Sequence, residues 1–268
     1  MAVTIVQPAY VDPRAELADE VWVGPFSVIG PDVRIGRGTR IENNVTITGH
    51  VTIGEENHIY PNVVIGAEPQ DISYRGSPTR VEIGHQNIIR EGVTINRATE
   101  KEEGLTSLGD HNFLMACSHV AHDCRVGNHV LLANGALLGG HVRVQDHASL
   151  SGAVAVHHYA TIGSYAFIAG LSRVLHDIPP YMLAEGHPAR PRCVNIVALK
   201  RNNFSARAIH ALAELHKLIY RSKVGLEPAR ELLRAADNLP PEVLRALQFL
   251  EESHAGRHGR AQETRRAA

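Results

Sequence analysis

Histidines gather in the middle of this chain in a pattern that indicates proton-transfer chemistry. Seven of the 17 histidines fall between His119 and His158, and the run Ser118–Cys124 reads SHVAHDC. A neutral imidazole accepts a proton near neutral pH, as a general base must. Asp123 directly follows His122, and such a carboxylate can orient the ring or hold its charge after protonation. We therefore predict that His122 is a general base.

A six-residue repeat must position these histidines. An aliphatic residue recurs every six positions, ten times from Val11 to Ile65, three times from Ile83 to Ile95 and twelve times from Leu108 to Val174. The next residue is often glycine, and the residue four positions after the aliphatic one is usually small or β-branched. Neither a helical period nor simple strand alternation brings turn residues back every six positions. The pattern is typical of an all-β solenoid.

Three such hexads are expected to close one triangular coil of 18 residues. The aliphatic side chain would point inward, and the following Gly or Asn would take the strained corner, where a positive φ costs little. Coils would stack about 4.8 Å apart, because no coil buries its apolar face alone. We predict a parallel β-helix over residues 1–180.

The coil length brings distant histidines together. One coil beyond His122 is position 140, next to His141, and one coil further is position 159, next to His157 and His158. We expect these imidazoles to form one column along an edge of the prism, beside a groove. Two other histidines fall on other faces and are expected to be solvated, namely His129 and His147.

Two segments interrupt the repeat. Residues 67–80 are polar and contain Gly and Pro, and residues 96–107 are highly charged. Loops that leave a rigid scaffold commonly carry function, and tolerated insertions are the alternative interpretation of both.

The pattern changes beyond Val174. We expect a connector over 181–204 and a helical domain over 205–253, with Ser205 as an N-cap, a second helix over Glu227–Ala236 and a third beginning near Pro240-Pro241. These helices can cap the open end of the solenoid, where unpaired strand edges invite aggregation. The polar tail 254–268 is expected to be disordered.

Composition excludes several classes of protein. Lys plus Arg is 27 and Asp plus Glu is 28, so no overall charge attracts nucleic acid or an acidic membrane. Met1–Tyr10 has no signal-peptide features, and no stretch approaches the ~20 apolar residues that span a bilayer. Three cysteines are too few for a disulfide framework, and no zinc-ligand spacing occurs. We expect a cytoplasmic protein with no stable membrane insertion and with no metal, a metal shared across a subunit boundary being the alternative.

Short motifs recur in a specific order along residues 3–250. They are Pro69-Gln70-Asp71, Thr94-Ile95-Asn96-Arg97, His119-Val120-Ala121-His122-Asp123-Cys124 followed by Val126-Gly127-Asn128, Leu132-Ala133-Asn134, Gly139-Gly140-His141-Val142, Ala155-Val156-His157, Asp177-Ile178-Pro179-Pro180-Tyr181, and Asn195-Ile196 with Leu199-Lys200-Arg201. In this order the chain resembles the UDP-N-acetylglucosamine acyltransferases of lipid A biosynthesis.

The resemblance implies a fold and a reaction. It implies a homotrimer of left-handed parallel β-helices, each with a C-terminal helical cap and with active sites between subunits. The implied reaction is the first step of lipid A biosynthesis, which moves an (R)-3-hydroxyacyl group from acyl carrier protein to the 3-position of UDP-N-acetylglucosamine. The carrier thioester is a co-substrate, so the implied reaction needs no cofactor.

The resemblance also implies roles for individual residues. His122 would remove the acceptor proton with support from Asp123, and the Gly140 N–H would stabilise the oxyanion. Asp71, His119 and His141 would hold the sugar. Contacts to nucleotide, phosphate or pantetheine would come from four residues, namely Gln70, His157, Asn195 and Arg201. Gly170 stands where the family limits acyl depth, so a long acyl chain is expected.

The chain departs from the family pattern at four positions, Ser73, Val197, Asn202 and His158, where Lys, Glu, Arg and Gln are usual. These departures leave nucleotide contacts and the choice between a 3-hydroxyl and a 3-amino acceptor open. A basic face for the acidic carrier would combine Lys200, Arg201, Arg207, Lys217, Arg221 and Lys223, and ordinary solvated surface is the alternative.

Other functions compete with this interpretation. An N-acyltransferase two steps later in the same pathway carries a separate domain before its β-helix, and the hexads here begin at Val11. An acetyl-CoA-dependent hexapeptide acetyltransferase would ignore long acyl carriers. A non-catalytic structural solenoid predicts that His122→Ala abolishes no activity.

Overall fold

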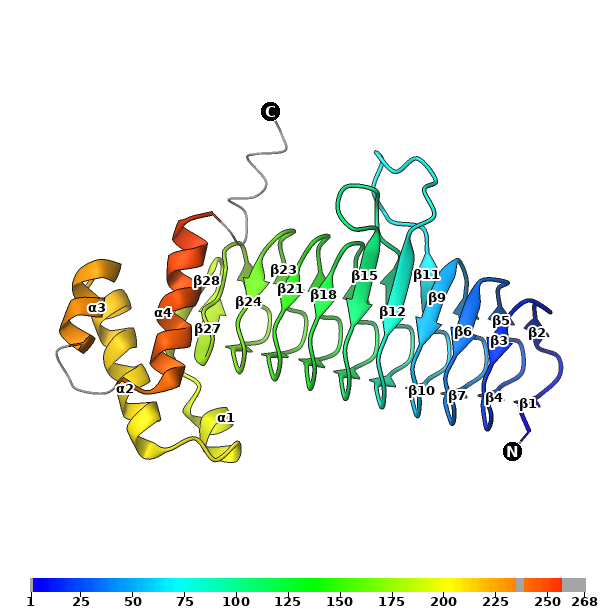
Figure 1. Cartoon of the computed structure of the whole chain (residues 1–268), viewed down its shortest axis with the longest axis horizontal. Helices are drawn as coiled ribbons and strands as arrows, with labels where there is room; N and C mark the ends of the chain where they lie inside the picture. The colour runs from blue at the N-terminus through cyan, green and yellow to red at the C-terminus, as the bar shows by residue number, and fades with distance from the viewer. Residues whose placement is uncertain (1, 235–238, 257–268) are drawn as a thin grey trace.

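The chain forms a long prism of short parallel strands followed by a group of helices, as seen in a computed structural model that describes residues 2–234 and 239–256 (Figure 1). The prism has three faces, which we call sheets A, B and C. Sheet A contains β1 (Thr4–Ile5), β4 (Trp22–Val23), β7 (Arg40–Ile41), β10 (His58–Ile59), β13 (Ile88–Ile89), β16 (Phe113–Leu114), β19 (Leu131–Leu132), β22 (Ser149–Leu150), β25 (Phe167–Ile168), β27 (Met182–Gly186) and β28 (Ala189–Val194).

The other two faces have the same design. Sheet B contains β2 (Tyr10–Val11), β5 (Val28–Ile29), β8 (Thr46–Ile47), β11 (Val64–Ala67), β14 (Thr94–Asn96), β17 (His119–Val120), β20 (Leu137–Leu138), β23 (Ala155–Val156) and β26 (Arg173–Val174). Sheet C contains β3 (Glu16–Leu17), β6 (Val33–Ile35), β9 (His50–Ile53), β12 (Arg80–Ile83), β15 (Leu105–Leu108), β18 (Arg125–Val126), β21 (Arg143–Val144) and β24 (Thr161–Ile162).

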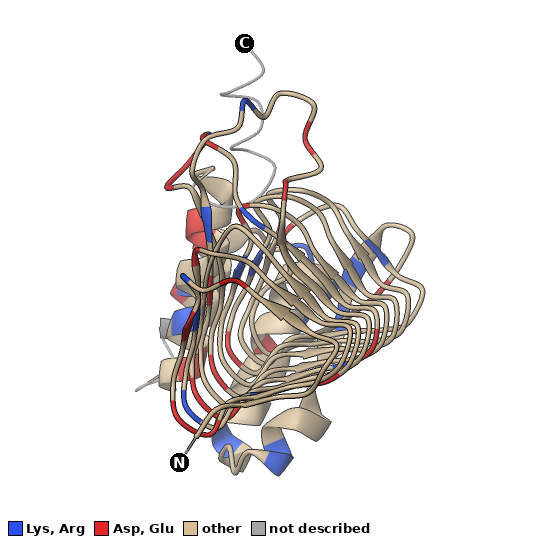
Figure 2. Cartoon of the chain, turned by 90° about the vertical axis from the view of Figure 1, so that its right-hand side faces the viewer, with Lys and Arg blue, Asp and Glu red and all other residues tan. Residues whose placement is uncertain are grey.

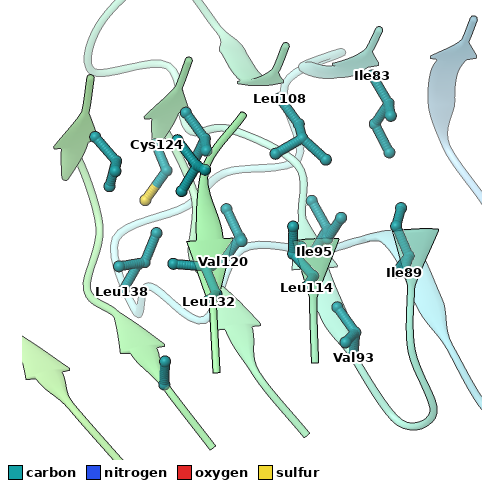
Figure 3. Packing of buried hydrophobic residues seen from close by; sticks show 14 of the residues in the cluster. Ile83, Ile89, Val93, Ile95, Leu108, Leu114, Val120, Cys124, Leu132 and Leu138 are labelled. Atoms are coloured by element: carbon teal, nitrogen blue, oxygen red, sulfur yellow. The ribbon is translucent and has the colours of Figure 1, made fainter. Parts of the chain in front are cut away.

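The strand register confirms that three hexads make one coil. Leu114 pairs with Leu132, and Leu132 pairs with Leu150, each one 18-residue coil further along the chain. The aliphatic residue of each hexad points into the prism, and Ile29, Ile41 and Leu132 are fully buried. Aliphatic side chains from neighbouring coils pack against one another inside the prism (Figure 3). This continuous apolar core fixes the position of every corner, including the corners that carry the histidines.

The prediction that the glycine after each aliphatic residue occupies a corner with positive φ is wrong. Positive φ occurs at the third residue after the aliphatic one, as at Phe26 (φ 61°), Asp123 (φ 60°) and His141 (φ 62°), and most hexad glycines do not have it. Those glycines instead allow close approach of neighbouring coils. A Cβ on Gly36 would lie 2.5 Å from the carbonyl carbon of Gly54 in the next coil, which is far inside van der Waals contact.

The two interruptions of the repeat are loops on one edge of the prism, between sheets B and C. The first loop, residues 68–79, joins β11 to β12, and the second, residues 97–104, joins β14 to β15. The second is shorter than expected because residues 105–107 belong to β15. Viewed along its axis the prism is triangular, and both loops rise from the same corner (Figure 2).

The C-terminal part closes one end of the prism. The expected connector contains a hairpin, in which β27 pairs antiparallel with β28, and a short helix, α1 (Ile196–Arg201). It is followed by α2 (Ala206–His216), the π-helical turn η1 (Lys217–Arg221), α3 (Leu226–Arg234) and α4 (Pro241–His254). Ser205 is the N-cap of α2, and its hydroxyl accepts a hydrogen bond from the Ala208 N–H at 3.0 Å.

Two expectations for this part lie partly outside the described residues. The helix expected over Glu227–Ala236 is seen as α3, and residues 235–238 are not described. The tail expected to be disordered from residue 254 begins with the last residue of α4, and residues 257–268 are not described. Within the described residues, no helix combines the length and the hydropathy that crossing a bilayer requires.

Candidate active site

His122 lies at the corner between sheets B and C, just after β17, with its side chain largely buried. Its Nδ1 is 2.8 Å from Oδ2 of Asp123. The same oxygen accepts hydrogen bonds from the N–H and the hydroxyl of Thr99, at 3.0 and 2.7 Å. Burial would raise the pKa of the Asp123 carboxyl, but the hydrogen bonds from His122 and Thr99 outweigh it and lower that pKa. Asp123 is therefore a carboxylate that accepts the Nδ1 proton, which leaves the His122 Nε2 lone pair open to a substrate.

Asp71 faces that open nitrogen. Its Oδ2 is 4.0 Å from the Nε2 of His122 and 2.5 Å from the Nζ of Lys101. Its Oδ1 accepts hydrogen bonds from the Ser73 N–H at 2.8 Å and the Ser73 hydroxyl at 2.7 Å. Burial would raise the pKa of the Asp71 carboxyl, but these hydrogen bonds from Lys101 and Ser73 lower it far below its ordinary value. An ionised acceptor thus lies on the substrate side of His122.

The expected single column of imidazoles is in fact two adjacent columns. His141 lies one coil beyond Asp123, and its ring stacks on Tyr159 with centroids 4.3 Å apart. It meets the ring of His122 edge-on at 5.2 Å, so the predicted proximity of His122 and His141 is confirmed. The position one coil beyond His122 is Gly140, and His158 follows in that column. The difference arises because His122 and Asp123 are successive corner residues, each with its own column.

The buried His141 touches two acidic groups. Its Nε2 is 3.7 Å from Oδ2 of Asp123, and its Nδ1 is 3.3 Å from Oε1 of Glu102. The second contact has the distance of an ion pair without hydrogen-bond geometry, since Nδ1 has no hydrogen-bond partner among the described residues. The His141–Glu102 contact is therefore electrostatic.

Gly140 makes room for the general base. A Cβ at this position would lie 2.4 Å from Cε1 and 2.6 Å from Nε2 of His122, so any side chain would displace the imidazole. The N–H of Gly140 donates no hydrogen bond within the described part of the chain. This amide, beside Nε2, is available to an oxyanion.

Two depressions meet at His122. The first, about 400 Å³, has polar walls from two loops and three successive coils, lined by Gln70, Asp71, Ile72, Lys101, His122, Gly140, His141, His158 and Tyr159. The second, about 540 Å³, runs along sheet B and is lined by Gln70, His119, Ala121, His122, Leu137, Leu138, Gly139, Gly140, Ala155 and Val156. A general base at this junction can act on a polar acceptor in the first depression while an apolar acyl chain lies in the second.

His119 faces outward from β17 into the second depression. Its Nδ1 is 2.7 Å from the hydroxyl of Thr94 on β14. Burial, and to a smaller degree the nearby His122, lowers the pKa of His119 and favours its neutral form. A neutral imidazole whose Nδ1 is held by Thr94 can offer Nε2 to a ligand.

Besides the buried Asp123, which contacts His122, four residues expected at the site lie outside both depressions. Asn195 is the N-cap of α1, and its side chain also donates to the Tyr165 carbonyl at 2.9 Å. His157 packs on the ring of His158, the neighbour that lines the first depression. The remaining two are exposed, namely Gly170, near Gly152, and Arg201, in the last turn of α1.

Sequence reasoning missed three residues of the second loop, Thr99, Lys101 and Glu102. The dense charge of this segment was the available signal, but nothing in the sequence shows that the loop folds back over the corner. Tyr159 was within reach of the sequence, because it stands one coil beyond His141. Coil arithmetic placed both His157 and His158 near the column, and the resemblance assigned a ligand contact to His157, whereas His158 is the one that lines the first depression.

Three residues at the corner could hold a cation. One ligand atom each from His122, Asp123 and His141 lie within 4.8 Å of one another. Oδ2 of Asp123, however, already accepts hydrogen bonds from Thr99 and His122, which a cation would have to displace. The contacts present favour acid–base chemistry over metal binding.

The fold and the site place this chain in the class of hexapeptide-repeat acyltransferases. The chain is a left-handed parallel β-helix followed by a C-terminal helical region. Residues 14–49 and 106–140 match the bacterial transferase hexapeptide model, and residues 177–259 match the second domain of UDP-N-acetylglucosamine O-acyltransferase. By these matches, and by its identity to whole-length relatives, the chain belongs to the UDP-N-acetylglucosamine O-acyltransferase family.

The relatives match nearly end to end. The acyl-[acyl-carrier-protein]–UDP-N-acetylglucosamine O-acyltransferase of Thermodesulfovibrio yellowstonii is 44% identical, over 94% of this chain and 98% of that protein. The Syntrophobacter fumaroxidans enzyme of the same name is 46% identical, over 92% and 96%. Among solved structures, the UDP-N-acetylglucosamine acyltransferase of Bacteroides fragilis has a TM-score of 0.89 at 36% identity, with 92% of this chain and 97% of that one covered. The Campylobacter jejuni enzyme has a TM-score of 0.87 at 34% identity, with 93% and 97% covered.

Proposed function

We propose that this chain transfers an (R)-3-hydroxyacyl group from acyl carrier protein to the 3-hydroxyl of UDP-N-acetylglucosamine, the first step of lipid A biosynthesis. The observation that carries the proposal is the position of His122. Its Nδ1 is held by Asp123, and the residue lines both a polar depression fit for a sugar and an apolar one fit for an acyl chain. The relatives that match nearly end to end bear the name of this activity.

The reaction follows from the groups around Nε2. His122 takes the proton of the sugar 3-hydroxyl while that oxygen attacks the thioester carbonyl carbon. The carbonyl oxygen becomes an oxyanion and accepts a hydrogen bond from the Gly140 N–H, an interaction often worth roughly 3 kcal/mol. Collapse of the intermediate breaks the carbon–sulfur bond, and the carrier thiolate receives the proton from His122. Asp123 holds Nδ1–H throughout and stabilises the imidazolium.

The remaining site residues are assigned to the two substrates. Asp71, His119 and His141 hold the sugar, and Gln70, which lines both depressions, contacts the nucleotide sugar or the pantetheine. Three residues outside the depressions, His157, Asn195 and Arg201, are assigned to nucleotide, phosphate or pantetheine contacts in a cleft of a homotrimer, to which a neighbouring subunit contributes. We place the enzyme in the cytoplasm, with the helical region as the docking face for acyl carrier protein.

The acyl chain is assigned to the apolar depression on sheet B. Leu137, Leu138, Ala155 and Val156 form its walls. Gly170 lies outside this depression, and we assign it to the far end of the acyl path, where the absence of a side chain leaves space. An open groove favours a long acyl chain over an acetyl group.

A direct assay tests this function. Purified protein is incubated with 3-hydroxyacyl carrier proteins of increasing chain length and with UDP-N-acetylglucosamine or its 3-amino analogue, and products are identified by mass spectrometry. We expect an acylated nucleotide sugar from long hydroxyacyl donors and the 3-hydroxyl acceptor. Turnover of acetyl-CoA without turnover of long acyl carriers would overturn the proposal, and preference for the 3-amino analogue would correct the acceptor.

A further inference from the structure

The two loops on the edge between sheets B and C are joined directly over the active site. Lys101, in the second loop, and Asp71, in the first, form an ion pair whose Nζ–Oδ2 distance is 2.5 Å. We propose that Lys101 is a positioning residue for the acyl transfer, fixing the Asp71 carboxylate opposite the open nitrogen of His122. This inference rests on the function proposed above.

The two carboxylate oxygens of Asp71 have different partners, and this difference supports the role of Lys101. Oδ1 is held within its own loop by the N–H and hydroxyl of Ser73. Oδ2, the oxygen that binds Lys101, is also the oxygen 4.0 Å from the Nε2 of His122. Lys101 therefore acts on the atom of Asp71 that faces the base.

The position of Lys101 is set by the rest of its loop. Two residues earlier, Thr99 donates its N–H and its hydroxyl to Asp123, and the Lys101 N–H donates to the Thr99 hydroxyl at 3.3 Å. At the base of the loop, Arg97 donates to Glu68 at 3.0 Å, which ties the second loop to the first. These contacts hold the Lys101 backbone over the polar depression, although 40% of its side chain is exposed.

The positive charge of Lys101 matters because of the carboxylates around His122. His122 lies between two carboxylates, Asp123 at Nδ1 and Asp71 beyond Nε2. An unpaired Asp71 would favour a proton on Nε2, and a protonated ring cannot act as a base. Other titratable groups line this corner as well, namely His119, His141, Glu102 and His158. Lys101 supplies the positive charge that offsets Asp71, so Nε2 stays free for the acceptor proton.

The experiment is a double-mutant cycle in the assay described above. It compares the wild type with Lys101→Met, Lys101→Arg, Asp71→Asn and the combination of Lys101→Met with Asp71→Asn. Glu100→Gln serves as the matched control, since Glu100 is an exposed neighbour in the same loop and lines neither depression. Rates are measured from acidic to alkaline pH, and thermal unfolding verifies that each variant is folded.

We expect Lys101→Met to lower kcat/KM for the acceptor about tenfold, within the range of coupling between groups in one network. The acid limb of the pH–rate profile should move to higher pH, because an uncompensated Asp71 favours the protonated ring. Lys101→Arg should recover most of the activity, and Glu100→Gln should behave as wild type. In the Asp71→Asn background, Lys101→Met should change the rate less than about twofold.

Two outcomes would overturn the inference while leaving the proposed function in place. One is an active wild type with Lys101→Met equally active and an unmoved pH profile. The other is a loss from Lys101→Met that persists in full in the Asp71→Asn background, because Lys101 would then act on the substrate without Asp71. An inactive wild type would instead reject the proposed function itself.

Discussion

Each functional side chain at the corner is restrained by a partner, either a close neighbour in sequence or a residue of the second loop. Asp123 orients His122 through Nδ1, Thr99 orients Asp123, and Lys101 with Ser73 orients Asp71. These partners come from a hexad corner and from two loops. A general base needs this restraint, because proton transfer depends on sub-ångström placement of the nitrogen that accepts the proton.

At the residue scale, Gly140→Ala tests the space that the base requires. The new Cβ would lie 2.4 Å from Cε1 of His122, so the ring must rotate or shift away from the acceptor. We expect kcat to fall by about 10²-fold, comparable to the loss of one oxyanion donor, while the core is untouched. Steady-state kinetics and thermal unfolding measure the two effects.

As a control, Gly135→Ala changes a glycine at the preceding corner, five residues before Gly140, with open space around its Cβ position. Its positive φ of 66° makes a small stability cost the expected result, with kcat preserved. Equal kcat in Gly140→Ala and the wild type would show that the His122 ring does not need this space.

At the scale of elements, the second loop is the part whose role the sequence left undecided. Residues 97–104 contribute Thr99 to Asp123, Lys101 to Asp71 and Glu102 to His141. The six-residue phase predicted the coils well, because a buried aliphatic residue recurs at a fixed interval. A loop outside that phase has no periodic constraint, so its contacts depend on side-chain geometry that the sequence pattern does not contain.

Thr99→Val tests the loop as a support for the catalytic carboxylate. It removes the hydroxyl that donates to Oδ2 of Asp123 and keeps the shape of the side chain. We expect a loss of about 1.5–3 kcal/mol in the free energy of unfolding at neutral pH, typical for a hydrogen bond to a charged group. Turnover should also fall, because Asp123 is oriented less firmly.

The pH dependence of that loss follows from the lowered pKa of Asp123. Burial opposes the lowering, and the bonds from His122 and Thr99 produce it, so the stabilisation is present above the unfolded-state pKa of an aspartic acid. It disappears as pH falls through the lowered pKa of the folded state. Chemical unfolding at neutral and strongly acidic pH should show the difference between Thr99→Val and wild type shrinking, and a difference independent of pH would contradict this role.

At the scale of the whole molecule, stacked coils turn sequence distance into spatial proximity. His122 and His141 are separated by about one coil, and their rings are 5.2 Å apart. That proximity followed from the hexad count alone. Coil arithmetic also places Asp123, His141 and Tyr159 in one column, but it does not tell which residue turns each corner, and the sequence expectation placed the positive φ at the wrong position in the hexad.

The most direct test of the whole account is His122→Ala in the hydroxyacyl-transfer assay, with His129→Ala as the control. His129 belongs to a different stack of rings, with His111 and His147, away from both depressions. We predict that His122→Ala lowers kcat about 10²–10⁴-fold, the usual contribution of a general base, while His129→Ala remains close to wild type. Wild-type turnover by a folded His122→Ala protein would contradict the account.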